Sequence, residues 1–187
     1  NCAFLTNLSA LISLTFNGHH QISDLSPIGK LERLLFLNLN DGANQNLSFL
    51  TNLTQLQMLS ASQMSLNDVS AVAPLTNLVY LSLSQNRLQN LDPLASLFDL
   101  EMLDVSLNWL TNITALTNCP KLSSLSVWAN YLKNAANELE LSTTTVFDQV
   151  RAREFGYVEE APQAVWGTVR LSLTRTNGSL VLRWQPT

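Results

Sequence analysis

The residues of this 187-residue chain that could support catalysis or metal binding are few and scattered. His19 and His20 form the only histidine pair, and adjacent side chains in a turn rarely share a metal ion. No Asp, Glu or Cys stands at a supporting spacing, so an exposed turn is the better prediction there. The remaining candidates, four aspartates, do not converge on a histidine or on a second carboxylate; they are Asp24, Asp68, Asp92 and Asp99. No phosphate-binding loop or nucleophile elbow is present, so we predict no enzyme activity, no catalytic residue, no metal site and no cofactor within this chain.

The elements that would position any functional side chain are set by a 22-residue apolar repeat. Counted from Leu59, Leu81 and Leu103, the positions 0, +2, +7, +10, +13, +16 and +19 are apolar in all three units. Self-similarity at a fixed period is typical of a solenoid, in which a unit buries its apolar face only against its neighbours.

Each unit has two halves with different periods. Residues 102–106 alternate apolar and polar side chains, which predicts a short strand with one buried face. The second half, from Leu110 to Cys119, has an apolar residue at every third position, which favours 3₁₀ or irregular structure. Pro27, Pro74 and Pro93 all fall in second halves, where a missing N–H interrupts no strand ladder. Parallel strands are therefore expected on one side of the coil and leaner segments on the other.

Two stretches of the chain, LVYLSLSQNRLQNLDPLASL and LEMLDVSLNWLTNITALTNC, resemble leucine-rich repeats. They are similar to the 22-residue subclass found in bacterial internalins and in a eukaryotic phosphatase-regulatory subunit. The resemblance covers roughly residues 5–141. It implies an α/β solenoid, a right-handed coil with a parallel concave sheet and a 3₁₀ or irregular convex side. It also implies a structural asparagine ladder, formed by Asn86, Asn108 and Asn130, whose amides would satisfy backbone groups of adjacent coils.

The earlier units depart from this pattern. Gly42 and Met64 stand where the ladder asparagine is expected, and Asn44 fills an expected core position. The first coil, from Leu14 to Leu37, is one residue longer than the later ones, and the extra residue lies near 18–21. We therefore expect a looser asparagine ladder in the N-terminal half.

The chain divides into two parts. Residues 1–141 are expected to form a solenoid of about six repeats whose N-terminal cap is missing, because core positions are already occupied from Cys2 onward. Residues 142–187 are expected to form a C-terminal cap and a β-hairpin, or the start of an immunoglobulin-like module. A last helical turn at 135–141 is expected to close the stack. Alternating apolar residues flank Asn177-Gly178, which is a strong hairpin signal.

Outward positions of the expected strands form columns across the concave face. One column is largely apolar and is flanked by small polar residues, which is typical of a protein-binding face. The candidate partner-binding residues are Phe36, Met58, Tyr80, Met102, Asp104 and Trp128. The alternative is that the apolar side chains only support one another across the strands. Trp128, with Trp109 and Tyr131, could form a second patch or could cover the junction with the tail.

Composition narrows the class of protein. The net charge is −4 and only 13% of residues are charged, without the basic stripe that nucleic-acid binding requires. No stretch approaches the length of apolar sequence that a membrane span needs, so none is predicted. The scarcity of lysine on a Ser/Thr/Asn-rich surface favours an extracellular or cell-surface protein. At about 4.8 Å per coil, Cys2 and Cys119 are expected to lie roughly 20 Å or more apart, which is too far for a disulfide. We therefore predict two buried free thiols. An extracellular protein of this size without a disulfide favours a bacterial source.

The leading hypothesis is a non-catalytic, monomeric module that binds a protein ligand with its concave face. A structural spacer or cell-wall module that presents a neighbouring domain is the first alternative. An intracellular scaffold similar to the phosphatase regulator is the second, and the low charge counts against it.

Overall fold

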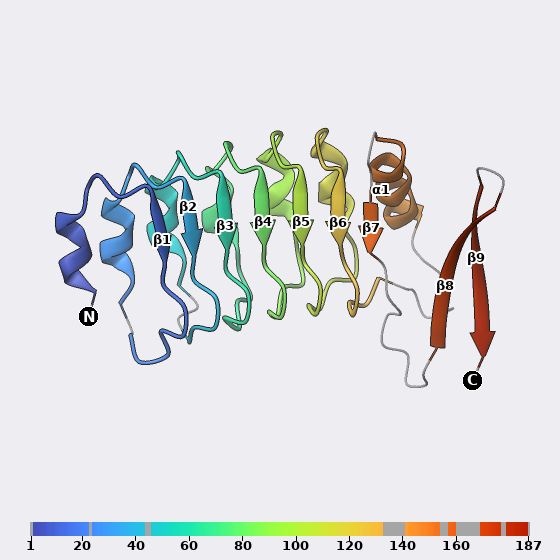
Figure 1. Cartoon of the computed structure of the whole chain (residues 1–187), viewed down its shortest axis with the longest axis horizontal. Helices are drawn as coiled ribbons and strands as arrows, with labels where there is room; N and C mark the ends of the chain where they lie inside the picture. Colours follow the sequence, from blue (N-terminus) through green and yellow to red (C-terminus); the bar gives the residue numbers. More distant parts are fainter. Residues whose placement is uncertain are drawn as a thin grey trace.

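The computed structural model describes residues 2–22, 24–43, 46–132, 141–153, 157–159, 169–176 and 179–186. Seven short strands lie side by side in chain order and form one parallel sheet along the length of the coil (Figure 1). They are β1 (Ser13–Thr15), β2 (Phe36–Asn38), β3 (Met58–Ser60), β4 (Tyr80–Ser82), β5 (Met102–Asp104), β6 (Ser124–Ser126) and β7 (Tyr157–Glu159). The predicted solenoid with a parallel sheet is confirmed.

The strand register repeats the sequence period. Equivalent residues pair across neighbouring strands, as Leu59 with Leu81 and Leu81 with Leu103. The first step is longer, because Leu14 pairs with Leu37, so the extra residue of the first coil is confirmed. Gly18, in the loop that accommodates it, adopts a φ of 66°, a left-handed conformation that glycine tolerates without steric cost.

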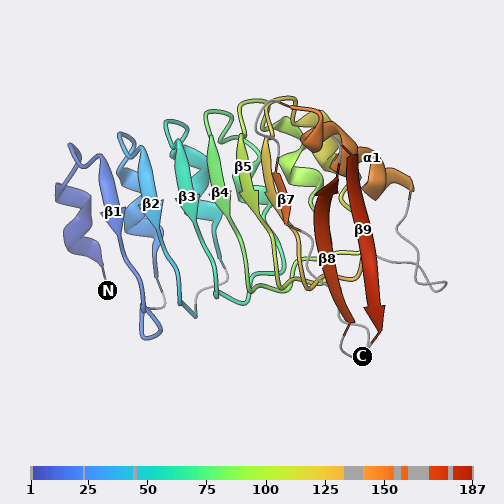
Figure 2. The ribbon, with the colours of Figure 1, turned by 45° about the vertical axis from the view of Figure 1, so that its right-hand side comes forward.

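The other side of the coil carries one 3₁₀ helix per turn, set behind the sheet (Figure 2). The helices are η1 (Ala3–Asn7), η2 (Ser26–Lys30), η3 (Ser48–Asn52), η4 (Ser70–Val72), η5 (Asp92–Ser96) and η6 (Thr114–Asn118). Pro27 and Pro93 stand in the first turns of η2 and η5, where a backbone N–H has no helical partner. The period of three in the sequence therefore predicted these helices correctly.

The core is a continuous stack of leucine-rich layers between the sheet and the 3₁₀ helices. All the apolar repeat positions of the three regular units, from Leu59 to Leu122, are at most 2% exposed. Cys2 and Cys119 are both buried and both free, as the sequence predicts. Gly29 of η2 faces η3 so closely that a Cβ at this position would lie 2.8 Å from the Phe49 carbonyl oxygen. Asn44 lies outside the described residues.

A helix and a strand continue the coil beyond β6. Helix α1 (Leu141–Arg151) contacts η6 and β7, and it buries Val146, Phe147 and Val150. The helical turn expected at 135–141 falls mainly outside the described residues; the described helix begins at Leu141. Within the described part of the chain, no helix combines the length and apolarity needed to cross a membrane.

The last two strands form the expected antiparallel pair. Strand β8 (Val169–Thr176) pairs with β9 (Ser179–Pro186) from Val169 opposite Pro186 to Thr176 opposite Ser179. The antiparallel pairing that the sequence predicts on either side of Asn177-Gly178 is therefore confirmed, while these two residues themselves lie outside the described ranges.

Candidate functional site

The concave face of the sheet is built by the alternation of side chains along each short strand. The middle residue points into the core, as Leu37, Leu59 and Leu103 do, and its two neighbours point outward. Because the strands pair in register, outward residues line up in columns that run across all the coils.

The first column is apolar over its middle four strands. Phe36, Met58 and Met102 expose 37%, 39% and 40% of their surfaces, and Tyr80 between them is partly buried. At its N-terminal end the column borders a hollow of about 380 Å³ that extends across β1–β4. Methionine and aromatic side chains that are exposed in a contiguous row can serve as adaptable anchors for a protein ligand.

Polar columns flank this apolar one, and hydrogen bonds hold their side chains in place. Ser60 donates to Asn40 Oδ1 at 2.8 Å, and the Ser62 and Ser82 hydroxyls lie 2.9 Å apart. Further along, the Ser106 and Ser126 hydroxyls lie 3.0 Å apart. The concave face is therefore a preorganised surface of small hydroxyl groups beside a row of apolar anchors.

The remaining predicted partner-binding residues lie toward the C-terminal end of the sheet. Asp104 is partly buried on β5, and its Oδ1 accepts the Ser106 backbone N–H at 3.0 Å. Trp128 is partly buried just after β6. Trp109 and Tyr131 are 46% and 55% exposed, but they occupy equivalent positions beyond the strand ends, outside the concave columns.

Two residues of the concave face escaped the sequence analysis. Strand β7 pairs with β6, so Tyr157 extends the first column beyond Ser124 and Glu159 extends the second beyond Ser126. Tyr157 is 57% exposed, and Glu159 Oε2 accepts a hydrogen bond from the Ser126 hydroxyl at 2.8 Å. The distance in sequence from Leu125 to its partner Val158 is one and a half times the length of a repeat, so the repeat period does not predict this strand.

The asparagines at the equivalent position of three coils are buried beside the strand ends. Asn86, Asn108 and Asn130 are 5%, 1% and 1% exposed. Each side-chain amide donates to carbonyls of its own coil and of the preceding one; Asn108 Nδ2 lies 3.0 Å from both Val105 O and Leu83 O. Each side-chain oxygen accepts an N–H of the preceding coil, as Asn108 does from Leu88 at 3.0 Å.

The prediction of an exposed turn at His19-His20 is wrong for His19, which is only 3% exposed. His19 stands at the ladder position of the first coil, stacks on Phe16 and donates through Nδ1 to Phe16 O at 2.8 Å. Its ring fills the space above Gly42, where a Cβ would lie 2.2 Å from Nε2. His20 is exposed and lies 3.2 Å from an Asp41 carboxylate oxygen.

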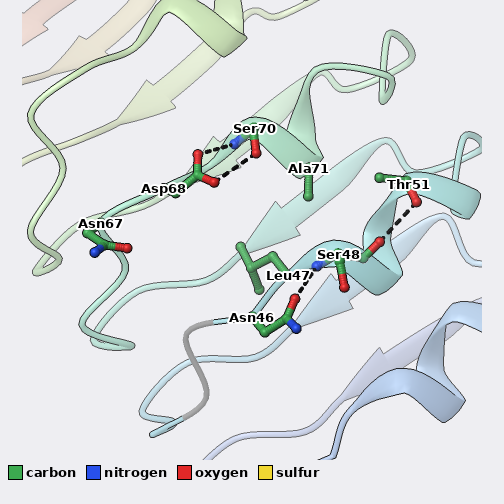
Figure 3. Close-up of a pocket in the computed structure, with 8 residues that line it drawn as sticks. All are labelled: Asn46, Leu47, Ser48, Thr51, Asn67, Asp68, Ser70 and Ala71. Atoms are coloured by element: carbon green, nitrogen blue, oxygen red, sulfur yellow. Dashed lines mark hydrogen bonds between the residues drawn. The ribbon is translucent and has the colours of Figure 1, made fainter.

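A second hollow, of about 490 Å³, lies between η3 and η4 and is lined mainly by polar side chains (Figure 3). Asp68 accepts both the backbone N–H and the hydroxyl of Ser70 at 2.8 Å, and these hydrogen bonds lower the pKa of its carboxyl. Asn46 accepts the Ser48 N–H in the same way. In other coils, Asp24 and Asn112 accept the backbone N–H of the residue two positions later in the same way. In each case that N–H belongs to the first residue of a 3₁₀ helix, so these side chains stabilise the helix starts. This repeated structural role makes the hollow a weaker candidate than the concave face.

The register, the one-helix-per-coil architecture and the leucine layers define a leucine-rich-repeat protein. Its fold is that of the internalins. An internalin (inlF) from Listeria monocytogenes is 23% identical with a TM-score of 0.63; the match covers 86% of this chain and 51% of that one. The internalin C2 of the same species is 23% identical, with a TM-score of 0.59 and coverage of 84% and 74%.

A leucine-rich-repeat protein from Leptospira interrogans is 21% identical with a TM-score of 0.70, and the match covers 83% of this chain and 38% of that protein. This chain therefore spans about half the length of the first internalin and less of the Leptospira protein. No protein-family model and no curated protein matches the sequence. At these identities the likeness is one of fold, and a fold by itself does not define a function.

Proposed function

We propose that this chain is a non-catalytic recognition module of a secreted or cell-surface bacterial protein and that it binds a protein ligand on its concave face. The observation that carries the proposal is the apolar column of Phe36, Met58, Tyr80 and Met102. Phe36, Met58 and Met102 stay exposed there, with Tyr80 partly buried among them, although the core beneath is filled by leucines that are nearly all inaccessible. A fold-stabilising role does not require that exposure.

The resemblance to internalins supports the cellular location in this proposal, since proteins of that group are often found on the bacterial surface. We further propose that the module acts as a monomer and does not bind nucleic acid. The acidic net charge of −4 and the uncharged middle of the concave face support the second of these points.

The test compares the wild-type chain with a Phe36→Ala/Tyr80→Ala/Met102→Ala variant in affinity capture from extracts of cell-surface proteins. Truncation of a central anchor typically costs about 2 kcal/mol or more of binding free energy, so we expect affinity for a captured ligand to fall at least about 30-fold. A Phe98→Ala variant is the matched control, because Phe98 is 57% exposed and lies outside the columns. It should leave binding unchanged.

Thermal melts of all three proteins distinguish a ligand-binding role of the apolar column from a role in stabilising the fold. Surface substitutions usually change stability by at most about 0.5 kcal/mol, so equal melting temperatures with lost capture support a binding face. A large loss of stability in the triple variant would show that the column is structural. Equal capture by wild type and triple variant, or none by either, would overturn the proposal and favour the spacer role.

A further inference from the structure

Charge is distributed unevenly over the concave face. In strands β1–β4 the outward positions of the first two columns hold no charged side chain; β5 and β7 then contribute Asp104 and Glu159. No lysine, arginine or histidine occupies an outward position of β1–β7. The face is thus uncharged over β1–β4, whereas β5–β7 form an acidic half in which Met102 and Tyr157 still continue the first column.

The two carboxylates flank one position of the second column. Asp104 pairs with Ser126 and Ser126 pairs with Glu159, so the acids stand two strand spacings apart, which is about 10 Å. Among the side chains that the structure describes between Cys2 and Glu159, neither acid has an ion-pair partner. By contrast, Asp99, in the turn before β5, is paired with Lys121 at 2.6 Å. The described side chains of the solenoid therefore leave the negative charge of the acidic half without a cationic partner.

The apolar column leads directly toward this acidic half. Its midpoint, between Met58 on β3 and Tyr80 on β4, lies two and a half strand spacings from β6, about 12 Å, and the acids stand two residues further along the strands, about 7 Å. The diagonal distance between the midpoint and the position between the acids is therefore about 14 Å. An extended polypeptide advances about 3.3 Å per residue and places residues i and i+4 on the same side. Four residues of such a segment therefore span the distance.

From this arrangement we infer that the concave face binds an extended polypeptide segment with an apolar side chain and a lysine or arginine about four residues away. The apolar side chain occupies the column near Met58 and Tyr80, and the cationic group lies between Asp104 and Glu159. The inference rests on the proposed function, because it specifies the ligand chemistry of the same face. Electrostatic complementarity of this kind contributes specificity and association rate more than raw affinity.

A library of random dodecapeptides displayed on phage, selected against the wild-type chain, is the probe. Parallel selections use Asp104→Asn/Glu159→Gln, which removes both charges but keeps the oxygens that accept from Ser106 and Ser126. Glu32→Gln serves as a matched control for the loss of an exposed acid elsewhere. Selected peptides are then synthesised with a fluorophore for titrations at low and high salt.

We expect wild-type peptides to be enriched in a basic residue about four positions from an apolar one. The double variant should keep the apolar preference, lose the basic one and bind wild-type peptides about 3- to 10-fold more weakly, with a smaller salt dependence. Glu32→Gln should behave as wild type.

Two failures are distinguishable. Peptides that require Phe36, Tyr80 and Met102 but show no basic preference, or bind the double variant equally well, overturn this inference and leave the proposed function intact. Selections that yield no binder, or only binders that are indifferent to the triple alanine variant, overturn both.

Discussion

Replacing Asn108 by alanine tests whether buried side-chain amides hold neighbouring coils together. The Asn108 oxygen accepts the Leu88 N–H at 3.0 Å, and the Asn108 amide donates to Leu83 O and Val105 O, each at 3.0 Å. Those two carbonyls have other donors, because Asn86 Nδ2 also reaches Leu83 O at 2.9 Å and Asn130 Nδ2 reaches Val105 O at 3.0 Å. The substitution therefore leaves one backbone donor, the Leu88 N–H, without its acceptor.

The expected change in the free energy of unfolding follows from these lost hydrogen bonds. A buried donor left unsatisfied costs about 1–3 kcal/mol, and each of the two lost amide hydrogen bonds contributes about 0.5–1.5 kcal/mol. We expect Asn108→Ala to lower the free energy of unfolding by about 3 kcal/mol. Asn112→Ala is the matched control, because this exposed asparagine makes one long backbone bond of 3.4 Å to Thr114. It should cost less than about 1 kcal/mol.

Asn86 and Asn108 both donate to the Leu83 carbonyl, which leads to a prediction for double variants. In the Asn86→Ala/Asn108→Ala double variant, Leu83 O loses both of its amide donors, so the loss should exceed the sum of the single losses by about 1 kcal/mol or more. Asn86 and Asn130 donate to no common carbonyl, so their double variant should be additive within about 0.5 kcal/mol.

Urea unfolding followed by tryptophan fluorescence measures these differences, provided that a second probe shows the same transition. The reasoning is refuted if Asn108→Ala costs less than about 1 kcal/mol, since water would then satisfy the Leu88 N–H. It is also refuted if both asparagine pairs show the same coupling.

Three further predictions concern two glycines, the reactivity of a buried thiol and the pH dependence of stability. Gly29→Ala should destabilise the protein by about 1–3 kcal/mol, because its Cβ would meet backbone at Phe49, whereas Gly18→Ala meets no atom within 4 Å and should cost only about 1 kcal/mol from its positive φ. Burial raises the pKa of Cys119 to about 11 from 9.0, so its thiol should react with a disulfide reagent at pH 8 only on unfolding. Because the raised pKa means that the fold favours the neutral thiol, this contribution to stability is complete below pH 9 and is lost as the pH rises toward 11; Cys119→Ala should flatten that part of the pH profile.

Local periodicity made most of the fold predictable. The repeat spacing from Leu59 to Leu103 predicted which residues face the core, and the every-third-residue pattern after Leu110 predicted the 3₁₀ helices. The same alternation predicted the apolar column that contains Phe36 and Tyr80. It did so because a strand of known register has only two faces, so a residue that is not buried must point outward.

Interpretation of single residues was less successful where contacts depend on neighbouring coils. His19 looked like part of an exposed loop, yet it is buried because Gly42, at the matching position of the next coil, leaves space for its ring. The residues next to His19 in the sequence do not indicate that Gly42 leaves this space. The same repeat position holds a ladder asparagine in later coils, which is a signal that could have indicated burial.

The sequence by itself determined the solenoid, its core, its 3₁₀ side and the apolar column, because these depend on a period that is repeated along one chain. Only the tertiary structure decided how the coil continues after Leu132 and what completes its concave face. Strand β7 joins the sheet well beyond one repeat after β6 and brings Tyr157 and Glu159 beside Ser124 and Ser126. That pairing depends on hydrogen bonds between strands distant in sequence and on the packing of α1 against η6, neither of which a local pattern can encode.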